Sequence, residues 1–146
     1  MKTIYRLAAT IMLMALPLPA LAAPIQAVMY KNPTCSCCET YAAYLEKNGF
    51  EVKLIPTNDL ALISTSLGVP EQLQGCHSIK IGQYVVEGFV PVDIVMKMLI
   101  ELPEITGLSL PGMPTGSAGM PGTKTEPFTI YAFTKDGKAP TVYAVE

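Results

Sequence analysis

Arginine is almost absent from this sequence, because Arg6 is the only one and it lies in an N-terminal segment that we expect to be removed. Without Lys2 and Arg6, the ten basic residues of the chain fall to eight against 12 acidic residues, a net charge of −4. Proteins that bind nucleic acid rely on clustered cations to neutralise the phosphates. We therefore expect no nucleic acid partner.

Several catalytic patterns are also missing. The Asp and Glu residues are scattered without a paired arrangement, so the sequence gives no support to hydrolytic acid–base chemistry. It contains no glycine-rich phosphate loop and no Ser/His/Asp set, because the only histidine, His77, stands directly after a cysteine. These absences leave the cysteines as the residues most suited to carry chemistry.

The sequence has no hydrophobic run long enough for a comfortable bilayer crossing. Its main run, at residues 7–18, follows two basic residues and precedes the small-x-small motif Ala20-Leu21-Ala22, which is typical of a secretory signal peptide. We predict a signal peptide at residues 1–22 and export to the periplasm. Residues 23–146 then form one soluble domain, with no membrane contact once the signal is removed.

Local patterns in the first part of this domain predict two strands around a helix. Residues 25–30 and 50–55 are apolar or alternating runs typical of strands. Residues 35–48 carry apolar side chains at spacings of three and four, which predicts a helix capped by Thr34 and stopped by Gly49.

The rest of the domain predicts two hairpins, two helices and a long loop. Glycine and proline mark most of the boundaries. The predicted elements are a short helix reaching Leu67, a hairpin at residues 78–86 with a Gly82-Gln83 turn, a helix at residues 91–102, a loop at residues 108–124 and a hairpin at residues 127–145.

The predicted order is therefore β-α-β-α-β-β-α, followed by a loop and β-β. A βαβ unit followed by ββα, with a cysteine motif at the start of the first helix, is the thioredoxin arrangement. We predict an α/β fold with a thioredoxin-like βαβ-ββα sheet and an added C-terminal β-hairpin.

Three of the four cysteines, Cys35, Cys37 and Cys38, lie within four residues at the predicted helix start. Free N–H groups and the positive end of the helix dipole lower the pKa of a thiol there. Cys35 and Cys38 have the C-x-x-C spacing of disulfide oxidoreductases, but that chemistry does not require Cys37. Three thiolates at one helix end repel each other unless a disulfide or a cation relieves them, and this favours soft metal ions.

The fourth cysteine, Cys76, precedes His77 at the start of the predicted hairpin. By analogy with thioredoxin-like folds, the loop before this strand faces the C-x-x-C motif. Four thiolates and an imidazole suit Cu(I) or Zn(II), and so many thiolates in an exported protein favour copper, with more than one ion bridged by sulfur. Met113, in the long loop, is a further thioether candidate. A plain disulfide between Cys76 and one of the other cysteines is the alternative.

Three stretches together resemble a known family, the CopG-like proteins, which are exported bacterial copper-resistance proteins described as a domain of unknown function. The stretches are "YKNPTCSCCETYAAYLEKNGFEV", "LGVPEQLQGCHSIKIGQYVVEGFVP" and "GLSLPGMPTGSAGM", within residues 29–120. One departure is Phe89, which follows V-E-G where His is expected in many relatives. If that histidine is a ligand there, this chain lacks it.

The resemblance implies a thioredoxin-like fold, a copper site and a role in handling the redox state of copper in the periplasm. Its partners would be copper ions and periplasmic copper efflux or cuproprotein-maturation components. The residues that it implies as ligands are Cys35, Cys37, Cys38 and Cys76 as thiolates that bridge copper ions, His77 as a terminal imidazole and Met113 as an extra ligand.

Three functional hypotheses follow. The first is a periplasmic Cu(I)-binding protein of copper resistance or homeostasis, in which the thiols couple electron transfer to copper binding. The second is a thiol–disulfide oxidoreductase in which Cys35 attacks and Cys38 or Cys37 resolves. The third is an exported domain whose cysteines form two structural disulfides. Whether copper or thiol chemistry proceeds with catalytic turnover stays open.

Overall fold

The computed structural model describes residues 23–146, so the signal peptide predicted at residues 1–22 lies outside the described residues. The described part of the chain contains no helix with the length and apolar character needed to cross a membrane. Its elements, in chain order, are β1 (Ile25–Lys31), α1 (Ser36–Lys47), β2 (Phe50–Pro56), α2 (Leu60–Ser66), the 3₁₀ turn η1 (Glu71–Leu73), β3 (His77–Ile81), β4 (Tyr84–Gly88), α3 (Val92–Glu101), β5 (Gly107–Leu110), β6 (Thr129–Phe133) and β7 (Thr141–Val145).

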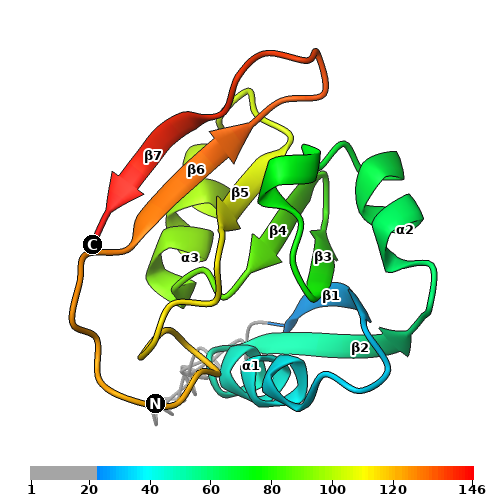
Figure 1. Ribbon diagram of the computed structural model, residues 1–146, viewed down its shortest axis with the longest axis vertical. Helices are drawn as coiled ribbons and strands as arrows, with labels where there is room; N and C mark the ends of the chain where they lie inside the picture. Colours follow the sequence, from blue (N-terminus) through cyan, green and yellow to red (C-terminus); the bar gives the residue numbers. More distant parts are fainter. Residues whose placement is uncertain (1–22) are drawn as a thin grey trace, which may run out of the picture.

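All seven strands belong to one sheet, in the order β2-β1-β3-β4-β5-β6-β7. The pairs β1–β2 and β4–β5 are parallel, and a helix connects the two strands of each. The other neighbouring strands are antiparallel. The sheet twists strongly, so that β2 at one edge and β7 at the other run in clearly different directions (Figure 1).

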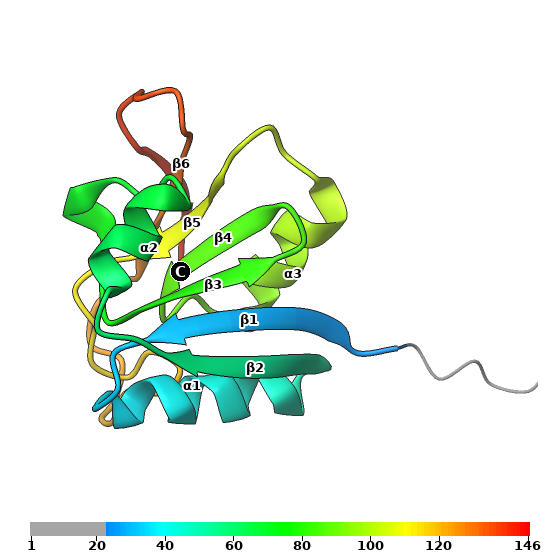
Figure 2. The same ribbon diagram turned by 90° about the vertical axis from the view of Figure 1, so that its right-hand side faces the viewer.

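Helices cover both faces of this sheet. Side chains of α1 and α3 share one core with the strands, while the segment after α2, including η1, packs on the opposite face against β4 and β6. Figure 2 shows α1 lying along β1 and β2, with α2 and α3 on other sides of the strands. The first core includes Met29, Tyr41, Leu45, Ile79, Val86, Val95, Met98 and Leu108, and the second includes Val69, Leu73, Val85 and Phe133.

Helix α1 forms where the sequence predicted it, but its cap differs. Cys35 is the N-cap, and its Sγ accepts a hydrogen bond from the backbone N–H of Cys38 at 3.2 Å. The predicted cap, Thr34, instead donates its own N–H and hydroxyl to the side-chain oxygen of Asn32. The prediction of Thr34 as the cap was therefore wrong by one residue. The side chain of Asn32 forms a turn with Thr34, and the helix begins after Cys35.

The α/β class and the C-terminal hairpin are confirmed, and the closer comparison with thioredoxin stays a prediction. The predicted loop at residues 108–124 begins too early, because Gly107–Leu110 is strand β5. This short strand is fully buried and pairs with β4 on one side and β6 on the other. The pairing with these two strands keeps residues 107–110 extended, and the turn-forming residues begin only at Pro111.

Candidate metal centre

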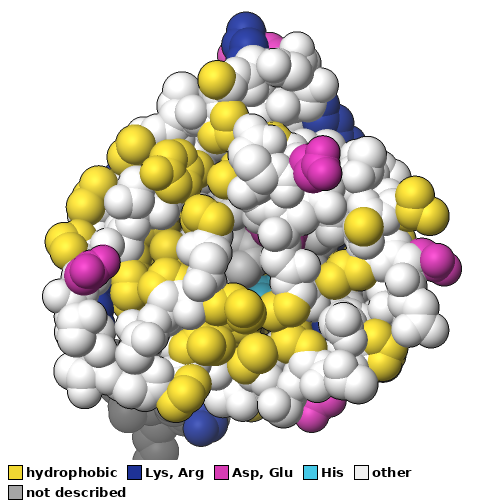
Figure 3. All heavy atoms as spheres, viewed as in Figure 1, with side chains coloured by type: hydrophobic (Ala, Val, Ile, Leu, Met, Phe, Trp, Pro, Cys, Tyr) yellow, Lys and Arg dark blue, Asp and Glu magenta, His cyan; other side chains and the backbone are white. Residues whose placement is uncertain are grey.

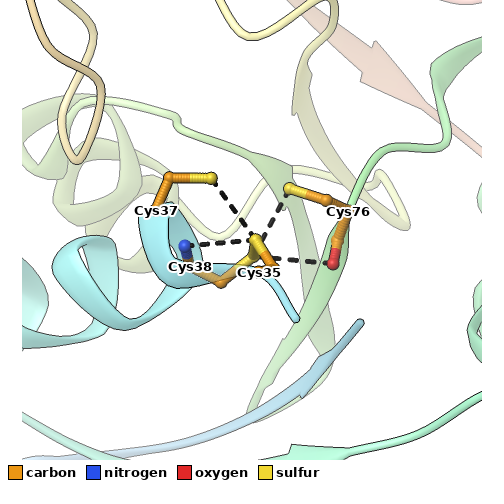
Figure 4. A group of neighbouring side chains, drawn as sticks. All are labelled: Cys35, Cys37, Cys38 and Cys76. Carbon is orange, nitrogen blue, oxygen red and sulfur yellow. Dashed lines mark hydrogen bonds between the residues drawn. A yellow bond between two sulfur atoms is a disulfide. The ribbon is translucent and has the colours of Figure 1, made fainter. Parts of the chain in front are cut away.

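The four cysteines come from two segments that meet at one end of the sheet. Cys35, Cys37 and Cys38 lie at the start of α1, and Cys76 lies in the last turn before β3. Figure 4 shows the side chains of Cys37 and Cys76 pointing from two sides toward the sulfur atoms of Cys35 and Cys38. The predicted meeting of Cys76 with the C-x-C-C motif is therefore present in the structure.

All four sulfur atoms lie within 4.8 Å of one another. Cys35 and Cys38 form a disulfide, with their Cα atoms 5.4 Å apart, whereas Cys37 and Cys76 are free thiols. The Sγ of Cys37 lies 3.3 Å from that of Cys35, and the Sγ of Cys76 lies 3.4 Å from that of Cys38. Each free thiol thus contacts one sulfur of the disulfide.

Backbone hydrogen bonds fix the two segments against each other. The N–H of Asn32 donates to the carbonyl of Cys76 at 3.0 Å, and the N–H of Cys35 donates to the carbonyl of Asn32 at 3.0 Å. The antiparallel pairing of β1 and β3 reaches this point, with Lys31 opposite His77. The spacing of the sulfur atoms therefore depends on the sheet and not only on the local motif.

The environment of Cys76 disfavours its thiolate form. Burial and repulsion from Cys37 raise the pKa of the Cys76 thiol to about 11. A cation bound among the sulfur atoms would reverse this effect, because a metal ion favours the deprotonated thiol. The donor set of closely spaced sulfur atoms fits a soft metal ion once the disulfide is reduced.

His77 is fully buried beside the cluster. Its Nε2 lies 3.0 Å from the carbonyl oxygen of Gly88, which only accepts, so Nε2 carries the proton. Burial lowers the pKa of His77 to about 4, and the imidazole is neutral at pH 7. The remaining lone pair on Nδ1 lies 3.7 Å from the Sγ of Cys76 and is available to a ligand.

Met113 is 48% exposed, with its backbone in the left-handed region at φ 49°. The loop that carries it reaches the cysteine motif through a later residue, Gly119. A Cβ atom built on Gly119 would lie 3.0 Å from the carbonyl oxygen of Cys37 and 3.0 Å from the Cβ of Tyr41. Met120, the next residue, packs against the core that includes Cys38. The structure thus places Gly119 and Met120 nearer to the motif than sequence reasoning suggested.

Two aromatic residues enclose His77: Tyr41, which the sequence analysis did not single out, and Phe89, which stands where a histidine is expected in many relatives. The Tyr41 ring lies 5.3 Å from the imidazole between centroids, and the Phe89 ring meets it edge-on at 4.9 Å. The hydroxyl of Tyr41 donates to the carbonyl of Val90 at 2.6 Å. The helical spacing of Tyr41 from Cys37 and Cys38 was the available signal, because residues three and four apart share a helix face.

The surface view shows a hollow near the middle of the face seen in Figure 1, with hydrophobic side chains along its lower side (Figure 3). Cys35, Cys37 and Cys76 are partly exposed, whereas Cys38 is buried. Three of the four cysteines therefore lie partly at the molecular surface.

Comparison with known proteins agrees with this architecture. Two solved structures, titled copper resistance protein CopG, form 1 and form 2, are each 32% identical to the chain with a TM-score of 0.77. Each match covers 84% of this chain and 98% of the CopG chain. The chain belongs to the CopG family. As a CopG-family protein, it also matches the model described as "Protein of unknown function, DUF411" over residues 73–120. None of the curated proteins matches it.

Proposed function

We propose that this CopG-family protein binds copper as Cu(I) in the periplasm and acts in copper resistance or homeostasis. The observation that carries the proposal is the set of four sulfur atoms within 4.8 Å of one another. The titles of the two CopG structures, which name copper resistance proteins, support the choice of metal. Thiolates are soft ligands, and Cu(I) is the soft ion that prefers them.

The ligands in this proposal are the thiolates of the four cysteines, which exceed the need of one small ion and can bridge several. The Nδ1 atom of His77 adds a terminal ligand, because Nε2 already donates to Gly88. Met113 is proposed as an additional thioether ligand, which requires its exposed loop to move toward the cluster. Reduction of the Cys35–Cys38 disulfide must come first, since a disulfide sulfur offers no thiolate.

The same two cysteines connect copper binding with redox chemistry. When the thiolates of Cys35 and Cys38 form their disulfide, they release two electrons, which reduce two Cu(II) ions to two Cu(I) ions. The remaining thiols, Cys37 and Cys76, stay beside them to hold the Cu(I) that is formed. In this scheme the partners would be copper ions and periplasmic copper efflux or cuproprotein-maturation components.

The test is a Cu(I) titration of the fully reduced protein against a competing chelator. We expect more than one tightly bound ion for the wild type and a lower stoichiometry or affinity for Cys37→Ser and for His77→Ala. Met113→Leu is measured beside them to test the thioether. Tight binding that is unchanged by both Cys37→Ser and His77→Ala would contradict the proposed ligand set.

A second function, thiol–disulfide exchange with other proteins, is supported by the Cys35–Cys38 disulfide at the start of α1. Under this alternative, the reduced protein reduces insulin disulfides, and activity requires Cys35 and Cys38 but neither Cys37 nor His77. Insulin reduction by the Cys35→Ser and Cys37→Ser variants separates it from the copper proposal.

A further inference from the structure

A buried carboxylate, Glu87 of β4, lies close to the cysteine cluster but belongs to neither proposed chemistry. Its side chain is fully buried, on the sheet face opposite to His77, and forms neither of the two ion pairs found within residues 23–146. Burial raises the pKa of this carboxyl to about 7, although two hydrogen bonds act against the change. Burying a charge without a cation is costly, so its presence calls for a specific role.

Both oxygens of Glu87 accept hydrogen bonds. Oε1 accepts from the backbone N–H of Gly75 at 2.6 Å, and Oε2 accepts from the hydroxyl of Ser78 at 2.5 Å. The hydroxyl of Ser64, on α2, lies 2.7 Å from that of Ser78 and extends the network. The side chain of Glu87 is therefore anchored through β3 and α2 and presents one oxygen to the loop before β3.

That oxygen holds the residue directly before Cys76. On the other side of Cys76, its carbonyl accepts from the N–H of Asn32 at 3.0 Å. The Cys76 backbone is thus fixed on one side by the β1–α1 turn and on the other by Glu87. Between these two bonds, the Sγ of Cys76 lies 3.4 Å from that of Cys38.

We propose that Glu87 is a positioning residue for the cysteine cluster, whose carboxylate holds the Gly75 amide so that the Cys76 sulfur stays in contact with the sulfur atoms of α1. This inference rests on the proposed copper function and deepens it, because it assigns to Glu87 the task of holding the fourth sulfur atom, that of Cys76, beside the other three. The geometric claim itself needs no copper and is tested without it.

The test measures the alkylation rates of the two free thiols in the same molecules, with the Cys35–Cys38 disulfide intact. Mass spectrometry after a short pulse of N-ethylmaleimide reports Cys76 and Cys37 separately, so Cys37 serves as the internal reference. Glu87→Ala removes the acceptor, and we expect Cys76 to react about tenfold faster, because the segment before β3 loses the hydrogen bond that holds Gly75. Cys37 is expected to change by less than about twofold.

Two further variants distinguish the loss of the hydrogen bond to Gly75 from the loss of the charge of Glu87 and from a general loosening of the packing around it. Glu87→Gln removes the charge but keeps an oxygen that accepts from Gly75, so we expect the Cys76 rate to stay near that of the wild type. Ser109→Ala removes a neighbouring buried hydroxyl on β5, which donates to the Leu73 carbonyl, and leaves Gly75 untouched. It is expected to change neither thiol.

Three outcomes would overturn the proposal: an unchanged Cys76 rate in folded Glu87→Ala, an equal rise of Cys37 and Cys76, or an equal rise of Cys76 in Glu87→Ala and Glu87→Gln. If Glu87→Ala does not fold, hydrogen exchange of the wild type decides. The Gly75 amide is then expected to be protected like a strand amide, and exchange at the rate of an open loop would refute the role.

A Cu(I) titration of the same variants connects the two proposals. We expect Glu87→Ala to lower the copper stoichiometry or affinity and Glu87→Gln to preserve it. If wild-type protein binds no Cu(I), the proposed function fails, whereas the alkylation result for Glu87 stands independently.

Discussion

The imidazole of His77 is held in one orientation by the residues around it. Nε2 donates to Gly88, and the rings of Tyr41 and Phe89 pack against the imidazole. The orientation leaves Nδ1 directed to the side of Cys76. Side chains that orient a ligand matter for a metal site nearly as much as the ligand itself.

The hydroxyl of Tyr41 provides a test of this arrangement. Tyr41→Phe keeps the ring beside His77 but removes the buried donor to the Val90 carbonyl. We expect the free energy of unfolding to fall by about 1–2 kcal/mol, because a buried carbonyl loses its partner, while Cu(I) binding changes little. Urea unfolding and Cu(I) titration measure the two effects.

Tyr30→Phe is the matched control, because Tyr30 is only half-buried and its hydroxyl makes none of the side-chain hydrogen bonds found within residues 23–146. It is expected to leave stability nearly unchanged. A similar loss of stability in both variants would contradict the role of the Tyr41 hydroxyl in the fold. A large loss of copper binding in Tyr41→Phe alone would contradict the view that this hydroxyl acts on stability and not on the metal site.

At the level of elements, the loop after β5, at residues 111–128, closes over the start of α1. Gly119 is the point of contact and has a φ of +85°, where a side chain is disfavoured. Its position over Cys37 and Tyr41 leaves no room for a Cβ atom without movement. Glycine is therefore needed at this position for both conformation and close approach.

Gly119→Ala is expected to displace the loop from α1. Gly112→Ala is a matched control, because Gly112 has a φ of +84° but no heavy atom within 4 Å of the added Cβ. Both variants pay roughly 1 kcal/mol for the left-handed backbone, but only Gly119→Ala adds overlap with α1. Limited proteolysis of the loop and alkylation of Cys37 should both accelerate in Gly119→Ala alone, and equal behaviour of the variants would contradict the contact.

The elements that sequence patterns predicted well are those governed by local signals. Helix α1 has its apolar face at spacings of three and four and ends before Gly49, and the β3–β4 turn is formed by Gly82-Gln83. Strand β5 was missed because four residues followed by Pro111 carry too little local signal, and its state depends on pairing with β4 and β6.

The meeting of Cys76 with the C-x-C-C motif was predicted by analogy, and the structure confirms the proximity of the four sulfur atoms. The burial of His77, its contact with Phe89 and the role of Glu87 could not be predicted in the same way. These depend on which sheet face each side chain of β3 and β4 occupies and on what covers it. Residue-type patterns do not contain that information.

For the whole molecule, Glu87 predicts how stability depends on pH. Its pKa is raised from an ordinary value of 4.5 to about 7, so the folded protein takes up a proton that the unfolded chain lacks between these values. Stability therefore falls as pH rises from 4.5 to 7 and levels off above 7. The difference between the two pKa values corresponds to about 3 kcal/mol.

Glu87→Gln removes this contribution. We expect the free energy of unfolding of the copper-free wild type, relative to the variant, to decrease by about 3 kcal/mol between pH 4.5 and pH 8. His77, with its pKa lowered to about 4, acts in the opposite direction but equally in both proteins, so the comparison cancels it. Urea unfolding at several pH values measures the difference, and a constant difference would contradict the prediction.

The sequence separations among the four cysteines also set an order for the assembly of the cluster during folding. Cys35 and Cys38 are three residues apart and can pair in a chain that has no tertiary structure. Cys76 is 38 residues beyond Cys38, and it reaches the motif only when β3 pairs with β1. The appearance of a crosslink between Cys38 and Cys76 during refolding would therefore report when β1 and β3 pair. The four sulfur atoms would come together only late in folding.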